Sequence, residues 1–242
     1  MRRSLSWICS QPTRSDVIRL FTSTIIILSA FVHAASADEL AEQLRVNELM
    51  DKVGVEPIWT EQYLDIYIED RLTVIPDNLK LLREAGSIRS IVVEKMPGLP
   101  SRDYSFLKKT KVDRLVIFWH IGSTKEMLSY VRECDTLREL VLGLCEVTPD
   151  DAKTLAECRQ LASISISPAR ITKAHFDALG KASPNLKKLR IQSGNNDKLV
   201  AFDIAELKAL QLTTLTLKGF DVTEDTKKTI RSSLDPCEVK FE

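Results

Sequence analysis

Apolar residues recur in a six-residue motif that returns every 24 to 26 residues from position 63 to position 236. The clearest copy spans residues 137–142 and is apolar at its first, fourth and sixth positions. A fixed period of this length is typical of solenoid proteins, in which each unit buries its apolar face only by stacking on its neighbours. The same three positions in the other copies are Tyr63/Ile66/Ile68, Ile88/Ile91/Val93, Val112/Leu115/Ile117, Leu161/Ile164/Ile166, Leu186/Leu189/Ile191, Leu212/Leu215/Leu217 and Pro236/Val239/Phe241.

Each motif predicts a short strand, because alternating residues of a strand point to opposite sides of a sheet. A polar turn and a helix are expected to lead to the next strand. Thr148 precedes Pro149 and two acidic residues, which is a typical helix start. Three threonines share this cap position, and three apolar residues further on share an inner helical stripe: Thr148, Thr172 and Thr223, with Leu155, Leu179 and Ile230. Strand–helix–strand units of this length favour parallel strands and right-handed connections.

The sequence of residues 137–148 resembles the leucine-rich repeat family, in particular its helix-containing and cysteine-containing members. Cys145 stands where that family has an Asn or Cys whose side chain satisfies backbone groups in the turn. The resemblance covers residues 63–242, about seven units plus a terminal strand. It implies a right-handed α/β solenoid with short parallel strands on the concave face and helices on the convex face. It also implies that the concave face binds a protein or another ligand.

The segment before the repeats divides into two parts. Residues 1–37 contain four arginines, then an apolar run over 20–32, then Ala35-Ser36-Ala37, which is the order of a signal peptide with its cleavage site. The alternative is an uncleaved membrane anchor. Residues 38–62 are predicted to form a capping helix and a connector, the helix ending near Gly54. Its apolar residues at helical spacing are Val46, Leu49, Met50 and Val53.

If the register holds, the fifth and seventh positions of each motif point away from the core. An exposed apolar patch is then predicted over the second to fourth repeats, formed by Val92, Val116, Phe118, Trp119, Val141 and Leu144. Acidic residues flank it on one side (Asp65, Glu69, Asp70 and Glu94) and basic residues on the other (Lys187, Lys188, Arg190, Lys218 and Lys240). An apolar centre with a charged surround is typical of a protein-binding surface. Alternatively, Phe118 and Trp119 pack into the turn against Ile121, and the basic residues are a solvated face or meet an anionic glycan or an acidic partner.

Composition adds several exclusions. The 242 residues carry no formal net charge, which does not favour nucleic-acid binding.

Cys134 and Cys158 occupy equivalent positions in adjacent repeats, so buried thiols are favoured there and a disulfide is the alternative. His120 and His175 are interpreted as structural or solvated, and Asp150 and Asp151 as helix-start residues. No catalytic residue, metal or cofactor is expected, because the sequence has none of the common catalytic or phosphate-binding motifs.

These observations lead to one main functional hypothesis. The chain is predicted to be an exported, periplasmic or secreted, non-enzymatic module that recognises a protein partner through its concave face. The alternative is a structural or self-associating envelope element without a discrete ligand. A membrane contact is expected only through the N-terminal segment, if that segment is not cleaved.

Overall fold

The computed structural model describes residues 37–60, 63–68, 76–94, 104–118, 124–168, 170–194, 197–199 and 201–242. The chain divides into two compact units, Met1–Arg45 and Val46–Glu242. Helix α2 (Ala37–Val53) begins in the first unit and ends in the second. The predicted signal peptide lies outside the described residues except for Ala37, so its cleavage stays a prediction. None of the helices in the described ranges is long and apolar enough to cross a membrane.

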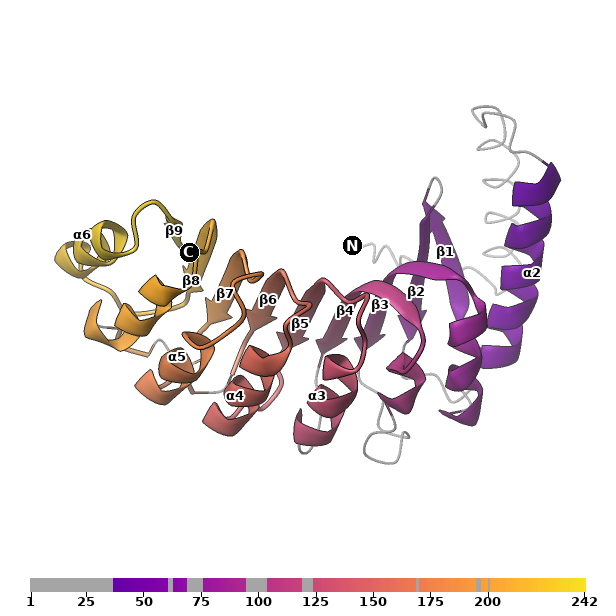
Figure 1. Cartoon of the computed structure of the whole chain (residues 1–242), viewed down its shortest axis with the longest axis horizontal. Coiled ribbons are helices and arrows are strands. Elements are labelled where there is room, and N and C mark those ends of the chain that lie inside the picture. The colour runs from indigo at the N-terminus through magenta and orange to yellow at the C-terminus, as the bar shows by residue number, and fades with distance from the viewer. Residues whose placement is uncertain are drawn as a thin grey trace, which may run out of the picture. The chain divides into compact units, whose positions relative to one another are not determined.

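The second unit contains a nine-stranded sheet whose strands follow one another in sequence order. The eight strands from β2 to β9 are parallel, as predicted, and β1 runs antiparallel to β2. Figure 1 shows this order along the sheet. The strands are β1 (Glu56–Thr60), β2 (Tyr63–Ile68), β3 (Ser87–Glu94), β4 (Lys111–Phe118), β5 (Glu139–Gly143), β6 (Ser163–Ile166), β7 (Lys188–Gln192), β8 (Thr214–Lys218) and β9 (Glu238–Phe241).

Helical segments connect most of the strands, as the repeat predicts. Helices α3, α4 and α5 lie along one side of the sheet (Figure 1), and we call the other side the strand face. A helix of the α type was expected in each unit, but three connections are 3₁₀ helices instead. The α-helices are α3 (Thr124–Arg132), α4 (Pro149–Glu157), α5 (Lys173–Leu179) and α6 (Glu224–Ser233), and the 3₁₀ helices are η2 (Pro76–Glu84), η3 (Tyr104–Leu107) and η4 (Ala201–Ala209).

The repeated apolar positions form one continuous core between the strands and the helices. The fourth position of the motif pairs in register from strand to strand, and all eight side chains are buried: Ile66, Ile91, Leu115, Leu140, Ile164, Leu189, Leu215 and Val239. Burial of such a side chain stabilises a fold by roughly 1.5 to 3 kcal/mol. The first repeat departs from the predicted motif. The register between β2 and β3 shifts between Leu64 and Asp65, so Leu64 lies in the core and Tyr63 is exposed.

The end of α2 and strand β1 close the core of the second unit at its first coil. Val46, Leu49, Met50 and Val53 are buried and belong to the core, as their helical spacing predicts. The predicted connector contains a strand, since residues 56–60 pair with β2. Trp59 Nε1 donates to Asn47 Oδ1 at 2.9 Å and ties β1 to the helix.

The helix start at Thr148 follows the predicted chemistry. Thr148 Oγ1 accepts from the Asp151 N–H (3.2 Å), and Asp151 accepts in return from the Thr148 N–H (2.9 Å). His175 takes the place of that aspartate in the next unit, where its Nδ1 accepts from the Thr172 N–H (3.2 Å). The proton of this buried imidazole is therefore on Nε2, which donates to the Val147 carbonyl at 3.0 Å. His175 is structural, as interpreted from the sequence.

Candidate binding face

The strand face carries the third, fifth and seventh positions of each motif. The fifth positions form one column across eight strands, as the sequence predicts: Tyr67, Val92, Val116, Val141, Ser165, Arg190, Thr216 and Lys240. Neighbouring strands lie about 4.8 Å apart, so successive side chains of this column are in contact range. The three valines are consecutive, so the register brings these three members of the predicted apolar patch together.

Val116 is less accessible than predicted. Its side chain is only 3% exposed, although it is absent from the core cluster on the helical side. It stands in the middle of the patch, between Val92 and Val141 on the neighbouring strands and next to Phe118 along its own strand. A central residue of a packed column is screened on several sides, whereas the outer valines are half-exposed. Val116 thus packs within the patch, and Val92 and Val141 are its more accessible valines.

The Phe118 ring packs against the next strand. A Cβ atom built on Gly143, its register partner on β5, would lie only 2.3 Å from Cδ1 of the Phe118 ring. The ring therefore occupies the space that a side chain at position 143 would fill. The predicted alternative was packing of Phe118 against Ile121. Ile121 lies outside the described ranges, and so does the predicted site residue Trp119.

Leu144, another predicted member of the patch, follows Gly143 in the chain. Its side chain is 57% exposed and its φ angle is 54°, in the left-handed region that residues with side chains rarely adopt. Such a conformation costs of the order of 1 kcal/mol in the folded chain. The adjacent Cys145 stabilises this turn, because its thiol lies 3.6 Å from the Ile117 carbonyl and 3.4 Å from that of Gly143. This is the role that the family resemblance implies for Cys145.

The described acidic residues beside the patch have partners within the chain. Asp65 forms an ion pair with Arg89, and Glu94 accepts a hydrogen bond from the Tyr67 hydroxyl. Arg114 and Glu139, which are register partners, form a further ion pair at 3.1 Å. Glu69 and Asp70 lie outside the described residues. The described acidic groups at this side therefore have partners already.

The basic side differs, because ion pairs neutralise only two of its five charged residues. Arg190 pairs with Glu242 at 2.9 Å, and Lys240 pairs with Glu238 at 3.2 Å. Lys188 and Lys218 have no ion-pair partner in the ranges that the structure describes. Lys187 points elsewhere, since its ammonium group donates to the Gln211 carbonyl at 3.3 Å. The strand face over β7 to β9 thus carries an excess of positive charge.

Ser90 is a residue of this face that the sequence analysis missed. It occupies the third position of its motif, between Asp65 and Arg114 on the adjacent strands. The residue is only 5% exposed, and its hydroxyl has no hydrogen-bond partner. A buried hydroxyl without a partner costs about 1 to 3 kcal/mol. Its outward position in the motif was readable from the sequence, but its burial was not.

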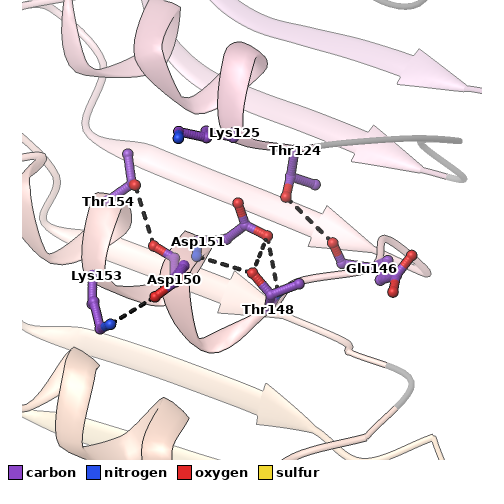
Figure 2. Close-up of a pocket in the computed structure, with 8 residues that line it drawn as sticks. All are labelled: Thr124, Lys125, Glu146, Thr148, Asp150, Asp151, Lys153 and Thr154. Atoms are coloured by element: carbon purple, nitrogen blue, oxygen red, sulfur yellow. Dashed lines mark hydrogen bonds and ion pairs between the residues drawn. The ribbon is translucent and has the colours of Figure 1, made fainter.

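A pocket lies between the starts of α3 and α4, on the helical side (Figure 2). It has a volume of about 660 Å³ and is lined mainly by hydroxyl and charged side chains. These groups bind one another: Thr124 donates to the Glu146 carbonyl (3.3 Å), and Lys153 pairs with Asp150 (2.6 Å). The hydrogen bond from Lys153 lowers the pKa of Asp150 below its ordinary value. Both Asp150 and Asp151 therefore serve the helix start, as predicted.

The described residues hold no cluster of three or more His, Cys, Asp or Glu side chains arranged to bind a metal. The described cysteines are free, and Cys134, Cys145 and Cys158 are buried. Burial raises the pKa of the Cys158 thiol to about 12, which keeps it protonated near neutral pH. A protonated, inaccessible thiol is a poor nucleophile, so the two equivalent cysteines are packing residues.

No protein-family model matches the sequence, and no curated protein is significantly similar to it. A solved leucine-rich-repeat protein of Leptospira interrogans is similar over 71% of this chain, with 20% sequence identity and a TM-score of 0.43. The chain spans 41% of the length of that protein. The sequential parallel strands, the repeated core positions and the helices on one side define the fold of this chain as an α/β solenoid of the leucine-rich-repeat type.

Proposed function

We propose that this chain is an exported, non-enzymatic module that binds a protein partner through the strand face. The observation that carries the proposal is the aligned column of Val92, Val116 and Val141 beside the Phe118 ring that packs over Gly143. An apolar centre surrounded by charged residues has the composition of a protein interface. The patch is also built on strands, which hold its side chains in fixed positions.

The packing of Phe118 favours a binding role for the patch. Aromatic residues that are held rigid before binding lose little conformational entropy when a partner arrives. The Phe118 ring packs over Gly143 on the next strand, which restricts its movement, and Phe118 remains partly exposed. Leu144 and Val141 extend the apolar surface next to it. A partner would therefore meet a preformed surface.

Export is supported by the N-terminal sequence alone. The arginines, the apolar run over 20–32 and the Ala35-Ser36-Ala37 site have the order of a cleaved signal peptide. Intact-mass measurement of the protein recovered from the exporting cell tests this directly. We expect the mass of a chain that begins at Asp38. The mass of a chain that still contains Met1 would favour the membrane-anchored alternative.

Site-specific photo-cross-linking tests the binding face. A benzophenone amino acid replaces Val141 on the strand face or, as the matched control, Lys153 on α4 of the same unit. Exposure of exporting cells to light should give a cross-linked partner from position 141 and none from position 153. The same product from both positions would contradict the proposal. A product with twice the mass of the chain, confirmed by light scattering, would instead support the self-associating structural element.

A further inference from the structure

The strand face is divided along the order of its strands into an apolar part and a basic part. The apolar part lies over β3 to β5, with Val92, Val116 and Val141. The basic part begins two strands later, at Arg190 on β7. Two strand spacings correspond to about 10 Å, so both parts lie within reach of one short ligand.

The charge on the basic part is unbalanced. On β7 to β9 the outward positions carry Lys188, Arg190, Lys218 and Lys240, against Glu238 and Glu242. The two acids pair with Arg190 and Lys240, which leaves Lys188 and Lys218 unneutralised by the described residues. On the acidic side of the face, Asp65 is paired with Arg89, and Glu94 accepts a hydrogen bond from the neutral Tyr67 hydroxyl. On β7 to β9, the excess charge that a ligand could neutralise is positive.

A carboxylate already sits on this basic part. Glu242 Oε2 lies 2.9 Å from Arg190 Nη2, and both side chains remain more than one-third exposed. Ser165 and Thr216 flank Arg190 in the same column and add hydroxyl groups to its surroundings. The contact shows that the position accommodates a carboxyl group at hydrogen-bonding distance. It also shows that an external carboxylate would have to displace that of Glu242.

We propose that the strand face binds an extended polypeptide segment that carries aliphatic residues next to a run of acidic residues. The aliphatic residues pack on the valine column, and the carboxylates bind Lys188, Lys218 and Arg190, where they displace Glu242. This inference rests on the proposed function and specifies the chemistry of the partner. A polypeptide is favoured over an anionic glycan because a glycan would leave the adjacent valine column and Phe118 unused.

The required length follows from the sheet. Val92 on β3 and Lys218 on β8 are five strands apart, or about 24 Å. An extended chain spans about 3.3 Å per residue, so roughly seven residues cross this distance. A labelled peptide of about ten residues, with four aliphatic residues followed by four glutamates, is therefore a suitable probe. The same residues in alternating order, and a version with lysine in place of glutamate, are the control peptides.

Fluorescence anisotropy with the full chain measures the binding. The block peptide is expected to bind, and its alternating and lysine versions to bind more weakly. The double substitution Lys188→Gln with Lys218→Gln should weaken binding about five- to tenfold, since two exposed ion pairs are lost. The matched control is Lys181→Gln with Lys208→Gln, which removes the same charge from connecting segments and should change binding less than about twofold. Glu242→Gln should strengthen binding, because Arg190 is released.

Several outcomes would overturn this inference. One is equal binding by the Lys188/Lys218 variant and the wild type, and another is failure of the block peptide to bind. A sulfated glycan that binds with the same dependence on Lys188 and Lys218 but is unaffected by Val141→Ser would identify a polyanion site instead. The proposed function is judged separately by the cross-linking at position 141. A partner captured there without any affinity for the acidic peptide would leave the function standing and reject only this chemistry.

Discussion

The ring of Phe118 on β4 lies against the backbone of Gly143 on β5, so closely that a methyl group on Gly143 would lie 2.3 Å from the ring. Replacement of Gly143 by alanine must therefore displace the ring. Crowding of this kind typically costs about 1 to 3 kcal/mol. We expect Gly143→Ala to lower the free energy of unfolding in urea by that amount and to weaken partner binding.

A double-mutant cycle isolates this contact. Phe118→Ala removes the ring, so Gly143→Ala in the Phe118→Ala background should cost less than about 0.5 kcal/mol. The coupling between the two substitutions should then account for most of the cost of Gly143→Ala alone. Equal costs of Gly143→Ala in both backgrounds would show that the ring does not occupy this space.

Ser90 provides a second stability test. Its buried hydroxyl has no hydrogen-bond partner, so Ser90→Ala removes an uncompensated polar group at little loss of packing. We expect the free energy of unfolding to rise by about 1 kcal/mol. Ser163→Ala, a half-exposed serine in the same column, is the matched control and should stay within about 0.5 kcal/mol. A loss of stability in Ser90→Ala would show that the hydroxyl is hydrogen-bonded in solution.

Much of the strand face could be predicted because a parallel sheet has a side-chain period of two and a constant register. One correctly placed motif, residues 137–142, therefore fixes which residues stand in the same column. That is why Val92, Val116 and Val141 were found to be aligned. The same logic placed Phe118 and Gly143 in one column, and a large ring beside a glycine was the available signal for their contact.

Other features of the fold depend on side-chain packing, which the repeat period does not determine. The burial of Val116 results from neighbours on three strands, whereas β-branched residues are common at exposed strand positions too. Strand β1 was missed because an antiparallel strand stands outside the repeat, and Pro57 within it argues against a strand. The shifted core position of β2 follows from the irregular register at Leu64, which no spacing in the sequence indicates.

The thiols allow a direct chemical test. Cys134 and Cys158 are free and almost fully buried, and burial raises the pKa of both thiols. We expect a thiol reagent at pH 8 to leave both unmodified in the folded protein and to modify both after unfolding in urea without a reductant. Mass spectrometry of the labelled peptides distinguishes the two cysteines. Labelling that required a reductant in urea would show the disulfide that the sequence left as the alternative.

The same burial predicts a dependence on alkaline pH. The folded protein keeps Cys158 neutral up to about pH 12, whereas an exposed thiol ionises around its ordinary pKa of 9.0. The contribution of the neutral thiol to stability is therefore complete below pH 9.0 and is lost as the pH rises towards 12. Urea unfolding of the wild type and of Cys158→Ala should thus show stabilities that converge with increasing pH. A constant difference would contradict the burial of this thiol.

Arg231 protects the last strand of the sheet. Its Nε lies 3.5 Å from the Val239 carbonyl at the free edge of β9, and its guanidinium group lies 5.1 Å from the centre of the Phe241 ring. Exposed edge strands pair readily with other chains. We expect Arg231→Ala to lower stability by about 1 kcal/mol and to accelerate hydrogen exchange in β9. Light scattering should also show concentration-dependent association.

Arg132→Ala is the matched control, because Arg132 is an exposed helix residue whose ion pair with Glu157 is 2.9 Å long and far from the edge. Loss of such a surface pair costs less than about 1 kcal/mol and exposes no strand. The Arg132 variant should therefore remain monomeric under the conditions in which Arg231→Ala associates. If both variants associate equally, the chains are kept apart by surface charge. The cover that Arg231 gives to the edge of β9 is then not the cause. If neither does, the edge is protected by Phe241 and the short length of β9 alone.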